Sequence, residues 1–525
     1  MRDFQMPGRS PVLASRGMCA TSHPLGALVA VDTLRRGGNA VDAAIAGAVT
    51  LGLCEPQMTG LGGDCFVLQK PAGSDEVVGL NGSGRAPAGA SADALRDRGL
   101  AAIPLGAAEA VTVPGAVDAF CALAERHGRL GLEDVLLPVA DLFEEGVPVA
   151  PRVAFDWRLA VDTLQGHARE RFLRDGAALP AGAAFALPGQ AEVLRRIARE
   201  GRTAFYEGEV AEDMLRTLQA AGGTHTPEDF AGTAADWTDP ISAPYRGTEI
   251  VEHPPNGQGA TALLLAAILS RFDIASMDPL GAERLHLEAE ATKLAYDARN
   301  RIVADPDHTT HLARMLDAAT ADRLAALIDP RRAMEAAAPL TEAVHRDTIY
   351  ITVVDRDRMA VSLIQSIYHP FGSGFATDRF GILLHNRGAG FNLTAGHPNE
   401  YGPGKRPMHT IIPGMLRVDG RVTMPFGVMG GAYQATGHAR FVSNLVDHGM
   451  DPQTAIDAPR AFADGGVLNV ERGYPDAVRA ELAQLGHEVR VPDGPIGGAQ
   501  AIRIDPAGYL EGASDPRKDG CALGY

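Results

Sequence analysis

Near residue 340, the sequence changes from mainly helical patterns to β-rich ones. Residues 331–347 are rich in Ala, Glu and Arg and have little periodicity, which is typical of a loosely packed connection. Runs of β-branched residues follow at 348–354 and 359–364, and the charged residues 355–358 between them predict a hairpin. Helices and strands are expected on both sides of the connection, without a linker rich in Pro, Gly and Ser. We therefore predict one layered α/β body.

Apolar residues at helical spacing predict two helices near the N-terminus, one stopped by Gly37 and Gly38 and one at 41–49. The middle of the chain is expected to be mainly helical, with its clearest helices at 117–127, 191–200, 259–270, 283–299 and 320–328. Further strands are expected at 65–69, 76–81, 381–384 and 422–426.

The chain carries 65 acidic and 48 basic residues, a formal net charge of −17, and it lacks the basic patch typical of nucleic-acid-binding proteins. No run reaches the roughly 18 apolar residues of a membrane span, and residues 1–15 lack the apolar core of a signal peptide. The five cysteines are scattered without a Cys-x-x-Cys pair, which favours buried thiols over a disulfide framework and therefore a reducing compartment. We therefore expect a cytoplasmic protein with neither a nucleic-acid nor a membrane partner.

Thr348 begins the first β-rich run, where a threonine is ordinarily only a strand residue. Its chemistry would change if the chain were cut between Asp347 and Thr348. A free α-amine has a pKa of about 8, so it could act as the general base for the hydroxyl of the same residue near neutral pH. The weakly patterned segment before Thr348 is compatible with such a cut.

Motifs along nearly the whole chain give this threonine a context. The stretch Asp-Thr-Ile-Tyr-Ile-Thr-Val-Val-Asp at 347–355 is followed by Phe-Gly-Ser-Gly at 371–374. The other motifs lie at 37–44, 60–64, 381–384, 404–407, 430–431 and 512–517. Each motif is weak alone, but together and in this order they resemble the gamma-glutamyltransferase family, and 347–355 resembles its processing site.

The resemblance implies the four-layer αββα sandwich of N-terminal nucleophile hydrolases. It also implies a single-chain precursor that cleaves itself before Thr348 into two associated subunits, 1–347 and 348–525. Thr348 would attack the carbonyl of a small-molecule amide and form an acyl-enzyme, which water or an acceptor amine then releases. No metal or organic cofactor is implied, and further dimerisation of the processed enzyme stays open.

The resemblance assigns roles to single residues. Gly430 and Gly431 match the glycine pair whose backbone N–H groups form the oxyanion hole. Ser366 lies where the family has a second hydroxyl beside the nucleophile, and Tyr368 lies at a pocket-lining position. Arg85 matches the arginine that holds the substrate carboxylate, with which a guanidinium can form two parallel hydrogen bonds.

Several positions depart from the family pattern. Arg387 and Gly390 stand where well-studied members have a Gln and an Asp, and that Asp receives the α-ammonium of a gamma-glutamyl group. His409 and Thr410 replace two serines that hold the substrate carboxylate, and the loop 393–407 is shorter than the usual lid. These changes favour an anionic acyl group without a free α-amine, as in a glutaryl or oxamate-type amide.

The sequence thus predicts a self-processing enzyme that cleaves a gamma-glutamyl or related carboxylate-bearing amide. The alternatives are an amidohydrolase or acylase with little activity on glutathione, and an unprocessed relative that only binds its ligand. His308 and His311 have a spacing that suggests metal ligands, but nothing nearby completes a site, and they are interpreted as loop residues.

Overall fold

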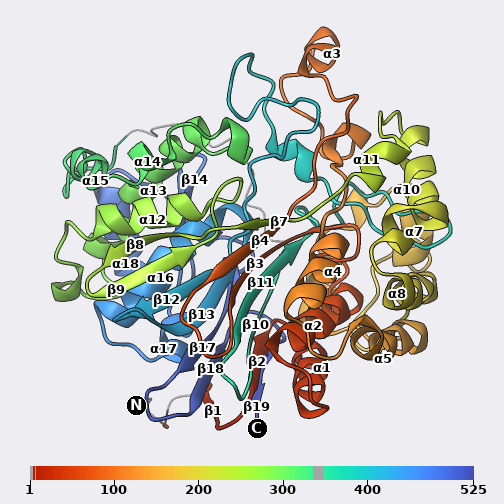
Figure 1. Ribbon diagram of the computed structural model, residues 1–525. Helices are drawn as coiled ribbons and strands as arrows, with labels where there is room; N and C mark the ends of the chain where they lie inside the picture. Colours follow the sequence, from red (N-terminus) through yellow and green to blue (C-terminus); the bar gives the residue numbers. More distant parts are fainter. Residues whose placement is uncertain (1–3, 6–7, 335–347) are drawn as a thin grey trace.

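The computed structural model describes residues 4–5, 8–334 and 348–525, and two stacked antiparallel sheets form its centre (Figure 1). The first sheet has the strand order β1 (Val12–Ala14), β18 (Leu510–Ser514), β17 (Gly498–Ile504), β13 (Arg421–Met429), β12 (Gly414–Val418), β9 (Thr248–Glu252) and β8 (Ile241–Tyr245). The second has the order β19 (Cys521–Gly524), β2 (Met18–Thr21), β10 (Ile349–Val354), β11 (Ala360–Ser366), β3 (Asp64–Lys70), β4 (Val78–Gly82) and β7 (Asp236–Thr238).

β10 is an inner strand of the second sheet, hydrogen-bonded to β2 on one side and to β11 on the other. Every residue of β10 and β11 is buried, which explains why their sequences are continuous apolar and β-branched runs rather than alternating ones. β11 in turn pairs with β3. The predicted subunits 1–347 and 348–525 therefore interleave in the same sheets, so a cut between them would leave both in one hydrogen-bonded body.

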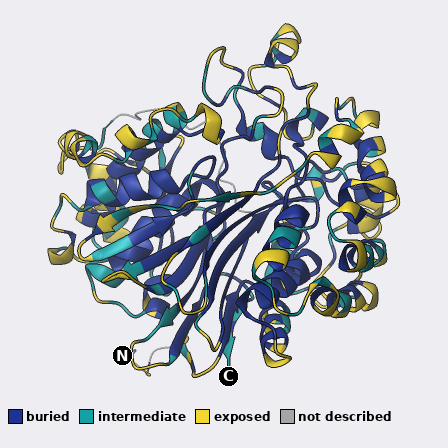
Figure 2. Ribbon diagram, in the orientation of Figure 1, coloured by how far each residue is buried: buried dark blue, intermediate teal, exposed yellow. Residues whose placement is uncertain are grey.

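Helices cover the outer face of each sheet (Figures 1 and 2). α1 (Pro24–Arg35) and α2 (Ala40–Cys54) lie on the second sheet, where α2 contacts β10 and β11. α12 (Gly259–Leu269) and α16 (Gln434–Val446) lie on the first sheet, and α13 (Ala282–Ile302) packs against both of these helices. The layers are thus helix, sheet, sheet and helix, which confirms the predicted αββα sandwich.

The start of α2 shows how local sequence and the sheet cooperate. Asn39 and Asp42 form a capping box, in which each side chain accepts a hydrogen bond from the other residue's backbone. The N–H of Ala40 donates to Asp355 Oδ2 at 3.0 Å, which ties the first turn of the helix to the β10–β11 hairpin turn. Small residues then let the helix approach the sheet closely, because a Cβ on Gly47 would lie 2.4 Å from Ile351 Cδ1.

The remaining elements frame these layers. A group of helices from the middle of the chain packs beside α2 (Figure 1). The further helices are α3 (Ala92–Asp97), α4 (Ala116–His127), α5 (Leu132–Glu145), α6 (Pro151–Leu159), α7 (His167–Phe172), α8 (Pro188–Glu200), α9 (Thr203–Tyr206), α10 (Gly208–Ala220), α11 (Pro227–Ala231), α14 (Leu312–Met315), α15 (Ala318–Ala325), α17 (Pro452–Asp457) and α18 (Asp476–Gln484). Two small sheets contain β5 (Val147–Pro148) with β6 (Ala184–Phe185), and β14 (Ala461–Asp464) with β15 (Val467–Val470) and β16 (Glu488–Arg490).

The predicted helices and most of the predicted strands are confirmed, with ends that shift by a few residues. The strand predicted at 381–384 is wrong. Gly381 has a positive φ of 67°, and only an isolated bridge joins Leu383 to Ala376. The backbone groups of this segment bond to a neighbouring loop instead, as when the Leu384 N–H donates to the Phe375 carbonyl at 3.0 Å. Of the connection predicted at 331–347, residues 335–347 lie outside the described residues.

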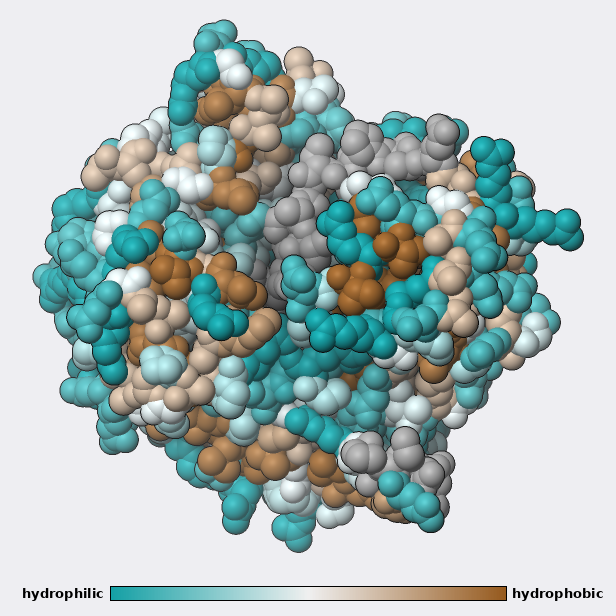
Figure 3. All heavy atoms as spheres, turned by 180° about the vertical axis from the view of Figure 1, so that it is seen from behind, coloured by the Kyte–Doolittle hydropathy of each residue, from teal (hydrophilic) through white to brown (hydrophobic). Residues whose placement is uncertain are grey.

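The surface and the thiols add little that is unusual. None of the helices in the described ranges combines the length and the apolar character needed to cross a membrane. On the face shown in Figure 3, hydrophilic residues predominate and hydrophobic residues gather in separate patches. All five cysteines are free thiols, and three of them are buried as expected, whereas Cys121 and Cys521 are partly exposed.

The two sheets meet most tightly at Gly427 of β13. The ring of Tyr350 from β10 lies directly over it, so that a Cβ on Gly427 would come within 2.3 Å of the ring. The Tyr350 hydroxyl is hydrogen-bonded to Ser362 Oγ at 2.7 Å, and Ser362 Oγ donates to the Phe426 carbonyl at 3.2 Å. These contacts hold the ring in place, so an added methyl group could not be accommodated by moving it.

We therefore expect Gly427→Ala to lower the free energy of unfolding by about 1–3 kcal/mol through overpacking. Urea denaturation of the two proteins measures this difference. Gly60→Ala is the matched control, because a Cβ there would meet nothing within 4 Å. Equal stability of Gly427→Ala and the wild type would contradict the described packing of the sheets.

Candidate active site

Thr348 lies immediately before β10 and is buried, with 1% of its surface exposed. Its Oγ1 donates a hydrogen bond to Ser366 Oγ at 3.3 Å. The two hydroxyls meet because the antiparallel register pairs Ile349 with Gln365, which places the residues just before β10 and at the end of β11 side by side. The structure thus brings together the predicted nucleophile and the predicted second hydroxyl, whereas Asp347 lies outside the described residues.

A chain of contacts leads from Ser366 to a buried arginine. Ser366 Oγ accepts a hydrogen bond from the backbone N–H of Tyr368 at 2.8 Å. Tyr368 has a φ of 78°, a left-handed conformation that is rare for a bulky residue and concentrated at functional sites. The guanidinium of Arg387 lies over the Tyr368 ring, 3.8 Å from its centroid, and Arg387 Nη1 donates to Thr410 Oγ1 at 2.9 Å. Four of the predicted site residues therefore form one connected group with Thr348.

Asp64 provides a buried negative charge close to this group. Its Oδ1 accepts hydrogen bonds from the backbone N–H groups of Gly84 at 2.9 Å and Gly115 at 3.2 Å. Its Oδ2 lies 3.1 Å from Nε2 of His409. Burial favours a raised pKa, but the neighbouring His385, His409 and Arg387 outweigh it and lower the pKa of Asp64 to about 2. The carboxylate is therefore ionised at neutral pH.

The imidazole of His409 is uncharged at neutral pH. Burial and the nearby Arg387 lower the pKa of His409 to about 3, although the contact with Asp64 acts in the opposite direction. With its Nε2 directed at Asp64, His409 anchors that carboxylate. The interpretation of His409 as a substrate-binding residue stays a prediction.

In the loop that leads into β3, two glycines lie too close to neighbouring backbone to carry a side chain. A Cβ on Gly62 would lie 2.0 Å from the Leu383 carbonyl oxygen, and one on Gly63 would lie 2.6 Å from the Ser366 carbonyl oxygen. The absence of side chains thus lets the loop approach the end of β11, where Asp64 pairs with Ser366 across the strands. The loop therefore forms one wall of the site.

Gly430 and Gly431, hereafter the glycine turn, follow β13 and precede α16. Both have positive φ values, 124° and 56°, and a Cβ on Gly430 would lie 2.9 Å from Gly497 Cα. Neither N–H donates a hydrogen bond to another of the residues that the structure describes. Two adjacent N–H groups in such a conformation are suited to binding a developing oxyanion.

Arg85 has different partners from those that its predicted role requires. Its guanidinium lies 3.3 Å from Asp236 and 3.5 Å from Asp305 and donates to the Gly404 carbonyl at 3.0 Å. The side chain is 44% exposed. Asp236 also pairs with the buried Arg406 at 2.9 Å. The binding of a substrate carboxylate by Arg85 therefore stays a prediction and would require an exchange of partners.

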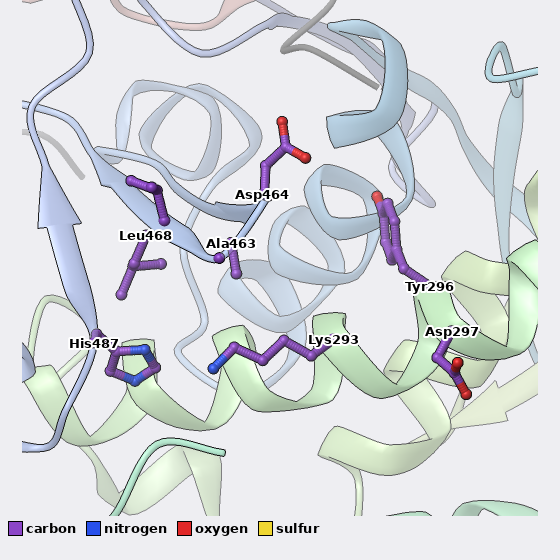
Figure 4. A pocket seen from close by; sticks show the side chains of 10 residues that line it. Lys293, Tyr296, Asp297, Ala463, Asp464, Leu468 and His487 are labelled. Atoms are coloured by element: carbon purple, nitrogen blue, oxygen red, sulfur yellow. The ribbon is translucent and has the colours of Figure 1, made fainter. Parts of the chain in front are cut away.

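One group of side chains has the composition of a metal site, but each of its members has a protein partner. His286 Nδ1 lies 2.8 Å from His487 Nε2, and His286 Nε2 lies 2.8 Å from the Asp329 carbonyl. Glu290 accepts from Lys293 at 2.7 Å and from the Met334 N–H at 2.8 Å. Figure 4 shows the Lys293 amine pointing toward His487. These contacts anchor the chain at 329–334.

The predicted loop histidines His308 and His311 are both exposed.

Sequence reasoning missed two buried residues of this region. Asp64 was part of a recognised motif, and an acid directly after two glycines in a buried strand could have been noticed. Gln258 had no such signal. Its amide donates to the carbonyls of Thr410 at 2.6 Å and Gly431 at 3.1 Å, so it connects Thr410, the partner of Arg387, to the glycine turn.

A threonine at the head of an inner strand, within helix, sheet, sheet and helix layers, defines the class of N-terminal nucleophile hydrolases. The gamma-glutamyltranspeptidase family model matches residues 26–525, and the chain belongs to that family.

Proteins of known name match this chain along almost its full length. The chain is 36% identical to the glutathione hydrolase-like YwrD proenzyme of Bacillus subtilis (strain 168), covering 98% of this chain and 99% of that protein. It is 34% identical to the oxamate amidohydrolase proenzyme of Klebsiella pneumoniae, with 98% and 99% covered. The crystal structure of cephalosporin acylase from Bacillus halodurans superimposes with a TM-score of 0.92 at 36% identity, covering 100% of this chain and 99% of that one. The chain is therefore an enzyme of the hydrolase type.

We expect Asp64→Asn to lower the free energy of unfolding by about 3 kcal/mol near neutral pH, because it removes a buried charge from two N–H donors and from the neighbourhood of the Arg387 cation. A carboxylate with a lowered pKa stabilises the fold above its unfolded pKa of about 3.9. That contribution is lost as the pH falls toward about 2. Urea denaturation at several pH values should therefore show a constant difference from pH 5 to 8 that shrinks below pH 4.

The exposed Asp97 provides the control for this measurement. Asp97→Asn should change stability by less than about 0.5 kcal/mol. A difference at Asp64 that instead grew as the pH fell from 5 would mean that the carboxyl group is protonated in the folded protein.

Proposed function

We propose that the chain cleaves itself before Thr348 and then hydrolyses amides whose acyl group carries a carboxylate and no free α-amine. The observation that carries the substrate class is the buried Arg387, held by Tyr368 and Thr410 in the group that contains Ser366 and Thr348. Relatives of this chain are named as proenzymes, which supports the proposed cleavage.

Self-cleavage begins when Thr348 Oγ1 attacks the carbonyl carbon of Asp347. The peptide C–N bond breaks, the nitrogen takes the proton of the hydroxyl, and an ester temporarily joins the two segments. Water then hydrolyses the ester, which leaves a carboxylate on Asp347 and a free α-amine on Thr348. Ser366, whose Oγ lies 3.3 Å from the attacking oxygen, orients it for this step.

Turnover uses the liberated amine as the base. It takes the proton of the Thr348 hydroxyl as the oxygen attacks the substrate carbonyl, and the charge that develops is stabilised by the N–H groups of Gly430 and Gly431. Collapse of the intermediate breaks the amide C–N bond, and the proton passes to the leaving amine. Water, or an acceptor amine, then attacks the acyl-enzyme and restores the hydroxyl.

The preference for an acyl group without an α-amine rests on two features. Arg387 supplies a positive charge that is 1% exposed, so a carboxylate reaching it would be held with little competition from water. At position 390, a Cβ would lie 2.8 Å from the Met408 carbonyl oxygen, so there is no room for an acidic side chain that could receive an ammonium. Asp64 is already bound by Gly84, Gly115 and His409.

A gamma-glutamyl amide such as glutathione is the second candidate. It is favoured by the names of relatives, since the chain is also 31% identical to the glutathione hydrolase proenzyme of Escherichia coli over 98% of its length. A third outcome is an unprocessed binding protein. Cytoplasmic location and further dimerisation stay predictions.

Purified wild-type protein should separate on a denaturing gel into bands of about 36 and 19 kDa, as expected from cleavage of the 55.1-kDa chain before Thr348. Thr348→Ala should leave one full-length band and no activity, because the hydroxyl serves both reactions. Thr348→Ser, which keeps a hydroxyl, should still be cleaved. Active material in which mass spectrometry found the 347–348 bond intact would overturn the proposal.

Arg387→Gln should reduce kcat/KM for a glutaryl anilide by about 10- to 100-fold, through the loss of a charge-assisted hydrogen bond to the substrate carboxylate. The matched substrate is the butyryl anilide, which lacks the carboxylate and should be affected far less. Arg85→Gln, tested on the same pair, measures whether that arginine also contacts the substrate. Steady-state rates with glutaryl, oxamate and glutathione amides complete the comparison, and a clear preference for glutathione would contradict the proposed substrate class.

A further inference from the structure

We propose that Gln258 is a positioning residue that fixes the glycine turn relative to the loop that contains Thr410. This inference rests on the function proposed above, since it concerns the donors that would bind the oxyanion and the loop that holds Arg387. Gln258 touches neither the predicted nucleophile nor, in the proposed scheme, the substrate.

The contacts of Gln258 are unusually complete for a single side chain. It lies just before α12 and is fully buried. Its Nε2 donates to the Thr410 carbonyl at 2.6 Å and to the Gly431 carbonyl at 3.1 Å, so both amide protons are used. Its Oε1 accepts from Arg299 Nη1 at 2.9 Å.

Arg299 fixes which way the amide of Gln258 points. A guanidinium has donors only, so the atom of Gln258 that faces it must be the oxygen, and the NH₂ group must face the two carbonyls. Arg299 is itself held on α13, with its guanidinium 4.5 Å from the centroid of the Tyr296 ring and its Nε donating to Asn300 Oδ1 at 3.0 Å. The orientation of the amide is therefore determined by α13.

Tyr296 adds a second anchor to the same turn. Its hydroxyl donates to the carbonyl of Ala432, the residue after Gly431. In Figure 4, Tyr296 projects from α13, one turn beyond Lys293. The carbonyls of Gly431 and Ala432, which follow the proposed oxyanion donors, are thus held by Gln258 at the start of α12 and by Tyr296 on α13.

The glycine turn needs such anchors because two glycines in sequence are the most flexible backbone in the site. The N–H of Tyr433 donates to the Gly430 carbonyl at 3.1 Å, which fixes the peptide plane that carries the Gly431 N–H. Gln258 fixes the next plane through the Gly431 carbonyl. Because the same amide also holds the Thr410 carbonyl, it fixes the oxyanion donors relative to the side chain that binds Arg387. Donors that are held before the reaction stabilise the transition state without reorganising.

Gln258→Glu tests this role. A carboxylate keeps the size of the side chain and can still pair with Arg299, but it has no proton to donate to the two carbonyls. We expect kcat for the glutaryl anilide to fall about 10- to 100-fold, less than the complete loss of one oxyanion donor costs. KM should change less than about 3-fold, because the oxyanion donors that Gln258 positions act in the transition state rather than in substrate binding.

Gln453→Glu is the matched control. Gln453 is also buried, donates to Asp457 Oδ1 at 2.8 Å and to the Ser514 carbonyl at 2.9 Å, and accepts from the Ser514 N–H at 3.0 Å. It belongs to α17 and contacts none of the site residues named above. Its substitution should destabilise the protein comparably while kcat stays within 2-fold of the wild type.

The outcomes separate the inference from the proposed function. A folded and cleaved Gln258→Glu enzyme with wild-type kcat would overturn the positioning role and leave Thr348 catalysis untouched. If Gln258→Glu does not fold, Arg299→Met tests the role instead, because this variant keeps the Gln258 amide but removes the group that orients it. Arg299→Met should lower kcat, and Arg299→Lys should have a smaller effect. Wild-type kcat in Arg299→Met would likewise overturn the role. A wild-type protein that neither cleaves itself nor turns over would instead remove the proposed function.

Discussion

Hydrogen-bonded pairing of β10 with β2 and β11 is the interaction on which the site depends. It satisfies the backbone polar groups of a fully buried strand and so makes burial of Thr348 at its head possible. The register with β11 places Ser366 against Thr348, and the register of β11 with β3 places Asp64 opposite Ser366. The placement of these three side chains, which come from separate segments, therefore follows from one run of sheet pairing.

The electrostatics of the site are built on that frame. Arg387 and Asp64 are opposite charges that are both buried, and burial of either alone would be costly. Backbone N–H groups and His409 share the charge of Asp64, while Tyr368 and Thr410 contact Arg387. The result is a buried group in which the Arg387 cation lies close to the hydroxyls of Thr348 and Ser366. This arrangement is the basis of the substrate class proposed above.

Much of this could be predicted from the residues. The β-branched runs on either side of 355–358 predicted the hairpin, and the motifs around Thr348 predicted the layered fold and the family. The prediction failed at 381–384, where Gly381 adopts a positive φ and the backbone bonds to a loop rather than to a strand. For Arg85, the motif predicted a role but could not show that Asp236 and Asp305 already occupy its guanidinium.

The sequence by itself determined most of the segments that form the central strands and helices, because burial on both faces and helix capping leave local patterns in consecutive residues. It also determined the family, through motifs that are each contiguous. Only the tertiary structure decided which distant atoms meet. His409 and Asp64 are 345 positions apart, and Gln258 reaches Gly431 across 173 positions. Such pairs leave no periodic trace along the chain, because their distance is set by how the sheets and helices pack rather than by the residues next to them.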